Sequence, residues 1–113
     1  MENKRYRWDD ISPDNPVPLL HRRTLSGEQV VGALVRLVPG CKVALHSHES
    51  EQITMVLTGE LFFEVQGVVH CIRPGEVIAI PSSLPHSVWT EALAVTAIDA
   101  WSPVMRKYGS VNA

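Results

Sequence analysis

A chain of 113 residues and 12.5 kDa has the length of one domain, and 45% hydrophobic against 19% charged residues suits a packed core. Ten basic and twelve acidic residues give a net charge of −2 without any long basic run, so nucleic acid is a poor partner. No apolar stretch approaches the roughly 18 residues of a membrane span. The charged N-terminus has no apolar segment behind it, so we expect no membrane partner, no export signal and a cytoplasmic location.

The elements predicted along the chain are short strands. Residues 1–20, with three prolines, are expected to form an extended N-terminal arm. Glycine and proline then separate runs rich in Val, Ile, Leu, Phe and Thr, and no segment has a sustained helical period. We therefore expect one all-β domain over 1–113, with a sandwich or closed barrel at about 21–101 and a C-terminal tail at about 102–113. The predicted strands are 30–38, 42–46, 52–58, 61–66, 68–73, 76–81, 86–90 and 93–101.

Three of the five histidines stand where a metal site would place them. His46 and His48 are two residues apart at the end of a predicted strand, so their side chains project from the same face. Gln52 begins the next strand, and His86 begins another strand far along the chain. If the barrel closes, these four side chains can point to one interior position. Imidazole nitrogens and an amide oxygen suit zinc, nickel, iron, manganese or copper, with positions left open for water or substrate.

Two spaced motifs relate the chain to a known family. Residues 40–59 read Gly, five residues, His-x-His, three residues, Gln, six residues, Gly. Residues 75–90 read Gly, five residues, Pro-x-Ser, two residues, His, three residues, Thr. In both motifs the chain resembles the cupin superfamily, which usually has Glu at position 52, Gly at 83 and Asn at 90. The resemblance implies a cupin double-stranded β-helix, or jelly-roll, barrel that binds one divalent metal ion through His46, His48, Gln52 and His86.

The glutamine distinguishes this metal site from the usual one. Three neutral histidines and Gln52 leave a divalent ion with its full charge of +2, which favours anionic or chelating oxygen ligands. Glu51 is the alternative ligand, but neighbouring strand residues face opposite ways, and the spacing to Gly59 favours Gln52. We therefore predict that Gln52, rather than Glu51, faces the metal.

A narrower resemblance points to a reaction. The segments 46–52, 81–88 and 99–103 are similar to small bacterial cupins that act on unsaturated uronates from pectin and alginate. That resemblance implies a metal-dependent isomerase that opens a 4,5-unsaturated uronate ring to the linear ketone. It also places Asp99 and Trp101 in the catalytic pocket. The family arginine has no counterpart, because Met105 occupies its position and Arg106 follows one residue later. From the residues alone, Asp99 ends an alternating strand where a carboxylate could transfer a proton.

Two other functions remain open at this point. The same ligands could hold a redox-active iron in a dioxygenase, or the chain could be a non-catalytic module that binds a small ligand. In each case the expected partner is a small molecule, anionic in the isomerase reading. We also expect a homodimer formed through edge strands, with the N-terminal arm contributing.

Overall fold

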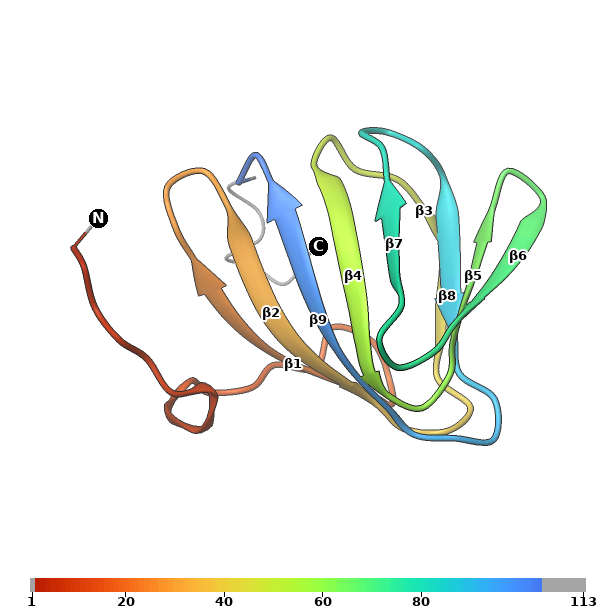
Figure 1. The fold of residues 1–113 in the computed structure, drawn as a ribbon, viewed down its shortest axis with the longest axis horizontal. Helices are drawn as coiled ribbons and strands as arrows, with labels where there is room; N and C mark the ends of the chain where they lie inside the picture. Colours follow the sequence, from red (N-terminus) through yellow and green to blue (C-terminus); the bar gives the residue numbers. More distant parts are fainter. Residues whose placement is uncertain (1, 105–113) are drawn as a thin grey trace.

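The computed structural model describes residues 2–104, which form two antiparallel sheets packed face to face (Figure 1). One sheet has five strands in the order β1-β2-β9-β4-β7, and the other has four in the order β3-β8-β5-β6. A 3-10 turn, η1 (Trp8–Asp10), lies in the N-terminal arm. The strands are β1 (Leu20–Ser26), β2 (Val31–Leu37), β3 (Lys42–His46), β4 (Glu51–Thr58), β5 (Leu61–Val65), β6 (Val68–Ile72), β7 (Val77–Ile80), β8 (His86–Trp89) and β9 (Val95–Ser102).

The all-β jelly-roll prediction is confirmed, and eight of the nine strands lie where the sequence places them. The exception is β1, which begins at the last residue of the predicted arm and pairs with β2 along its whole length. The sequence LHRRTLS has no apolar alternation, because one inward position is occupied by Arg22 instead of a hydrophobic residue. Most of the predicted tail 102–113, including Met105 and Arg106, lies outside the described residues.

The strands alternate between an inner and an outer face, as a two-layer sandwich requires. Along β4, for example, every second residue from Gln52 to Val56 is buried, whereas those between are exposed. The inner faces form one core between the sheets. Its buried hydrophobic residues are Leu20, Val31, Ala33, Val35, Leu37, Cys41, Val56, Leu61, Phe63, Ile72, Ile80, Val95, Ala97 and Trp101.

The motif glycines and their substitutes occupy turns with left-handed backbone. Gly40 and Gly75 follow proline at the third position of turns, closed by hydrogen bonds from Cys41 to Val38 and from Glu76 to Arg73. Ser83, at a position where the family usually has glycine, adopts a φ of 64° and donates its N–H to the carbonyl of His48 at 2.7 Å. This contact ties the β7–β8 loop to the loop carrying the histidines.

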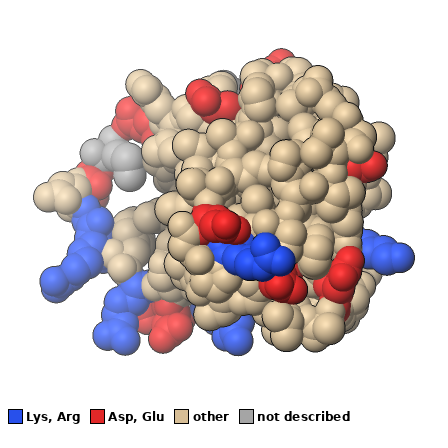
Figure 2. All heavy atoms as spheres, turned by 45° about the vertical axis from the view of Figure 1, so that its right-hand side comes forward, with Lys and Arg blue, Asp and Glu red and all other residues tan. Residues whose placement is uncertain are grey.

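The outer surface is apolar in places. Figure 2 shows a broad area without charged side chains on the face presented there. On the outer side of the five-stranded sheet, β4 and β7 expose neighbouring apolar residues, among them Ile53, Met55, Leu57 and Val77. Within residues 2–104, no helix is both long enough and apolar enough to cross a membrane.

Candidate metal centre and cavity

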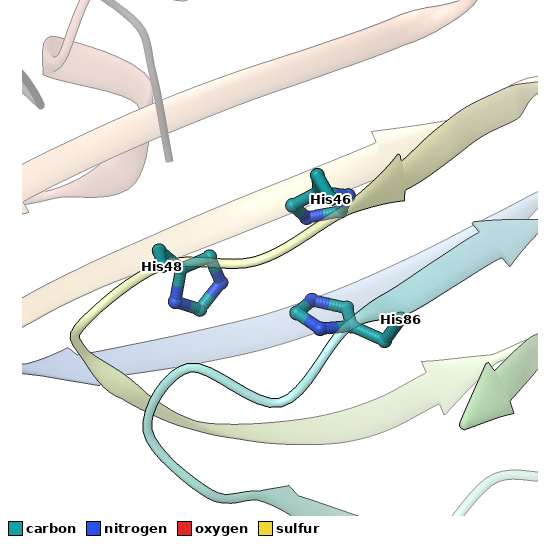
Figure 3. Close-up of side chains that lie close together, drawn as sticks. All are labelled: His46, His48 and His86. Atoms are coloured by element: carbon teal, nitrogen blue, oxygen red, sulfur yellow. The ribbon is translucent and has the colours of Figure 1, made fainter. Parts of the chain in front are cut away.

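Three histidines from two strands and a loop converge at one end of the sandwich. His46 ends β3 and pairs directly with His86, which begins β8, and His48 lies two residues beyond β3. Figure 3 shows the three rings turned toward one another. Their ligand nitrogens all lie within 4.8 Å of one another, so the cluster could hold a metal ion. The β3–β8 pairing therefore brings together residues that are forty positions apart in the sequence.

Backbone carbonyls fix the tautomer of each histidine. The Nδ1 atoms of His46, His48 and His86 lie 2.7, 2.8 and 2.9 Å from the carbonyl oxygens of Ala44, Ser50 and Leu84, respectively. A carbonyl can only accept, so each Nδ1 carries a proton, which leaves the Nε2 atom as the one that can offer a lone pair to a metal. Metal-binding histidines are commonly oriented in this way.

The surroundings of His46 and His86 lower the pKa values of both rings. Burial lowers the pKa of His46 and of His86, the carbonyl hydrogen bonds oppose this shift, and neighbouring imidazoles lower the pKa further. Both effects of the surroundings, desolvation and mutual repulsion, favour the neutral ring. A neutral imidazole is the form that binds a metal.

Two features of the structure fit a cation at this position. The Nε2 atom of His86 is buried and has no hydrogen-bond partner in the described chain. In addition, Nε2 of His48 lies 3.2 Å from Oε1 of Gln52, and both atoms are acceptors when the ring is neutral. Buried polar atoms rarely stay unsatisfied, and two facing acceptors repel unless a cation binds both. The donor set therefore fits a divalent metal.

The structure distinguishes Gln52 from Glu51 as the candidate for the fourth metal ligand. Gln52 is 6% exposed and faces the interior, whereas Glu51 is exposed and pairs with Ser102 at the outer end of β9. Gln52 thus lies beside His48, while the side chain of Glu51 points away from the cluster, as strand alternation predicts.

A directed chain of hydrogen bonds runs from Trp101 through Gln52 to Asp99. The indole N–H of Trp101 donates to Oε1 of Gln52 at 2.9 Å, which fixes the orientation of the amide. The amide nitrogen of Gln52 donates to Oγ1 of Thr54 at 2.9 Å, and the Thr54 hydroxyl donates to Oδ1 of Asp99 at 2.5 Å. Both predicted pocket residues are therefore connected to Gln52, and Thr54 is a linking residue that the motifs did not reveal.

Asp99 lies in surroundings that favour its protonated form. Burial raises the pKa of Asp99 from 3.8 to about 6, and the hydrogen bond from Thr54 and the charge of Arg22 oppose this shift. A carboxyl group that titrates near neutral pH can both accept and donate a proton under physiological conditions.

One cavity of about 460 Å³ between the sheets is lined by the three histidines, Gln52, Asp99 and Trp101. Apart from these polar groups the walls are mostly apolar, with Val17 of the N-terminal arm among them. Such a cavity, apolar with a few convergent polar groups, is typical of a small-molecule site. It also contains Arg22, which sequence reasoning missed because the strand that carries it was not predicted.

The two-sheet fold and the histidine cluster define a small metal-type β-barrel, and comparisons with known proteins give its family. Residues 33–98 match the family model of the cupin domain, so the chain belongs to the cupins. No functionally curated protein has a significant sequence match to the chain.

Solved structures share the fold at low sequence identity. An RmlC-like cupin from Shewanella frigidimarina superposes with a TM-score of 0.85 at 18% identity, covering 95% of this chain and 96% of the other. KdgF from Halomonas sp. gives 0.86 at 19%, covering 95% and 99%. An oxalate decarboxylase from Bacillus subtilis, a protein described as having Mn(II) centres, gives 0.81 at 18%, covering 91% of this chain and 30% of its own.

Proposed function

We propose that the protein is a metal-dependent isomerase that opens the ring of a 4,5-unsaturated uronate and yields the linear ketone. The observation that carries this proposal is the convergence of three imidazoles, the Gln52 amide oxygen and the Asp99 carboxyl group in one cavity. The motif resemblance to uronate-acting cupins and the structural similarity to KdgF support it. We further propose that the protein acts as a homodimer in the cytoplasm.

His46, His48, His86 and Gln52 would hold the divalent metal. When bound, it supplies a Lewis acid that attracts hydroxyl and carboxylate oxygens of the substrate. The carbonyls of Ala44, Ser50 and Leu84 keep the three imidazoles in position before any ligand arrives. Trp101 holds the Gln52 amide with its oxygen toward His48, which orients the fourth donor in the same way.

The reaction needs proton transfers but no oxidant or reductant. Ring opening breaks the bond between C1 and the ring oxygen, and the C1 hydroxyl loses its proton as the aldehyde forms. The former ring oxygen leaves as an enolate, which becomes the ketone when C4 gains a proton. One group that accepts the first proton and delivers the second keeps the balance.

Asp99 suits this proton transfer. It lines the cavity with the metal-type cluster, and its pKa of about 6 leaves both protonation states accessible. The Thr54 hydroxyl occupies Oδ1, and among the described residues no hydrogen bond involves Oδ2. Oδ2 is therefore the atom available to substrate.

The test is to incubate protein reconstituted with a single divalent metal with 4,5-unsaturated galacturonate and to follow the loss of the ultraviolet absorbance of the conjugated double bond. We expect wild type to accelerate the reaction and protein treated with a chelator not to do so. Asp99→Asn should retain its metal and lose about 10²–10⁴-fold in kcat. No acceleration by any metal-loaded form would remove the uronate assignment. Acceleration that survives in Asp99→Asn would keep the substrate and exclude Asp99 as the proton-transfer group.

A further inference from the structure

A buried arginine faces the same cavity as the metal-type cluster. Arg22 occupies an inward position of β1 and is only 5% exposed. It lines the cavity together with the three histidines and Asp99. Arginine is rarely buried to this extent unless its charge is paired or used.

The pairing of Arg22 leaves part of its guanidinium group open. Nε and Nη2 donate to the two carboxylate oxygens of Asp14 at 3.2 and 3.1 Å, and the backbones of the two residues exchange hydrogen bonds at 2.8 and 2.9 Å. Asp14 lies in the N-terminal arm at the rim, with its side chain 37% exposed. Within residues 2–104, no hydrogen bond from Nη1 is found. One edge of the fork is thus held by the arm, which orients the other edge.

The inner face of the five-stranded sheet leaves space between Arg22 and Asp99. Arg22 pairs with Val35, which pairs with Ala97, and Asp99 lies in the next row opposite Ala33. Ala33 and Ala97 are the small residues at these inward positions, and both are almost fully buried. The side chains of this part of the sheet therefore do not separate the guanidinium group from the site of proton transfer.

Two charged groups line the cavity among the described residues, Asp99 and Arg22, and Arg22 is the one that can bind an anion. The metal-type cluster offers imidazole nitrogens and an amide oxygen, whereas Arg22 adds a positive charge. The planar fork of a guanidinium group matches a carboxylate, and hydrogen bonds between charged groups are strengthened by burial. Apolar walls cover the remainder of the cavity and suit the ring of a small molecule.

We propose that Arg22 is the residue that binds the carboxylate group of the substrate, with Asp14 of the N-terminal arm as its positioning residue. The inference rests on the proposed function, which gives a sugar acid as the substrate and so supplies the carboxylate. It makes β1 and the arm the part of the chain that selects acidic over neutral sugars.

The test measures binding instead of turnover. Metal-loaded protein is titrated calorimetrically with D-galacturonate, which lacks the double bond and serves as an unreactive probe, and with neutral D-galactose. Wild type should prefer the acid. Arg22→Gln should lower this preference by about ten- to a hundredfold, the loss of a charged hydrogen-bonded pair. A wild type without preference, or an unchanged preference in Arg22→Gln, would overturn the proposal.

Three variants separate substrate binding from a merely structural ion pair. Arg36→Gln removes an exposed charge from the outer face of β2 and should leave the preference unchanged. Asp14→Asn releases the held edge of the guanidinium group, so it should lower the preference, but by less than Arg22→Gln does. A merely structural ion pair would instead reduce the stability of both single variants and leave the preference of the folded fraction unchanged. The double variant Asp14→Asn with Arg22→Met removes both charges of the pair, so neither is left without its partner. It should fold where Arg22→Gln does not, and it should show no preference for the acid.

The two proposals fail in distinguishable ways. If wild type prefers galacturonate through Arg22 but does not open the unsaturated ring, the arginine site stands and the isomerase assignment fails. If wild type opens the ring and Arg22→Gln leaves KM unchanged, the isomerase stands and the assignment of Arg22 fails. A role of Arg22 in substrate binding predicts a raised KM with a smaller change in kcat.

Discussion

At the scale of single residues, the orientation of the histidines leads to a prediction about metal content. His46→Ala, His48→Ala and His86→Ala should each reduce bound divalent metal at least about tenfold, because an incomplete ligand set remains. Gln52→Ala should weaken binding less, since an amide oxygen is the weakest of the four donors. Metal per folded protein, measured by elemental analysis after gel filtration, checks this result.

Glu51→Ala is the matched control for this series. Its side chain is exposed and belongs to the opposite face of β4, so its removal should leave metal content unchanged. If Glu51→Ala releases the metal and Gln52→Ala retains it, the ligand assignment is wrong by one residue.

A second prediction concerns the pH dependence of stability. Burial raises the pKa of Asp99 from 3.8 to about 6, so the folded chain holds a proton where the unfolded chain has lost it. The stabilisation from this proton is complete below the lower pKa and is lost as pH rises through the upper one. In metal-free protein, wild type should lose about 2 kcal/mol of unfolding free energy relative to Asp99→Asn between about pH 4.5 and pH 8. Urea titrations at both pH values measure the difference, and parallel profiles would show that Asp99 is ionised throughout.

Sequence reasoning found the residues whose spacing identifies them and missed those that only the fold brings near. The His-x-His pair, Gln52 and His86 lie in two motifs, and strand alternation alone places Asp99 and Trp101 on one face. Thr54 shares the inner face of β4 with Gln52 but belongs to no motif, and Arg22 lies in a strand without apolar alternation. Thr54 is recognisable only from its pairing with Asp99, and Arg22 only from its burial in the cavity.

At the scale of elements, the conformation of the turn after β4 leads to a prediction about Gly59. Gly59 has a φ of 85°, and a Cβ atom there would lie 2.2 Å from the carbonyl oxygen of Ala94, just before β9. Gly67 has a φ of 78° but nothing within 4 Å of the same position. Gly67→Ala should cost about 1–2 kcal/mol for backbone strain alone. Gly59→Ala should cost at least about 2 kcal/mol more, because rigid backbone must move. Equal midpoints in urea unfolding would contradict this difference.

β1 is the strand that the sequence did not predict, and its composition explains why. The other strands are rich in β-branched and apolar residues, which identify them in the sequence even in β4, where the polar Gln52 and Thr54 face inward. In β1, the inward positions after Leu20 hold Arg22 and Thr24, and the outward positions hold His21 and Arg23. A strand that has charged residues on both faces and few β-branched or apolar ones lacks the pattern by which strands are recognised.

At the scale of the whole molecule, the candidate ligands connect the two sheets. The three histidines belong to the four-stranded sheet and its loop, whereas Gln52 belongs to β4 of the five-stranded sheet. The N-terminal arm adds a third contact through the pair of Asp14 with Arg22. The cavity therefore depends on how the layers pack, and no single element of the sequence could have revealed its shape.

The last prediction is that two copies of the chain associate. The outer face of β4 and the edge strand β7 exposes neighbouring apolar side chains, with Met55 42% and Val77 59% exposed, an arrangement that soluble monomers usually avoid. Light scattering should give about twice the chain mass of 12.5 kDa. Met55→Glu and Val77→Glu should each shift the protein toward monomer, because a charge on this face would be buried without a partner. Val69→Glu, on the equally exposed edge strand β6 of the other sheet, is the matched control and should remain dimeric. A monomeric wild type would exclude the dimer, and dissociation by Val69→Glu alone would move the interface to β6.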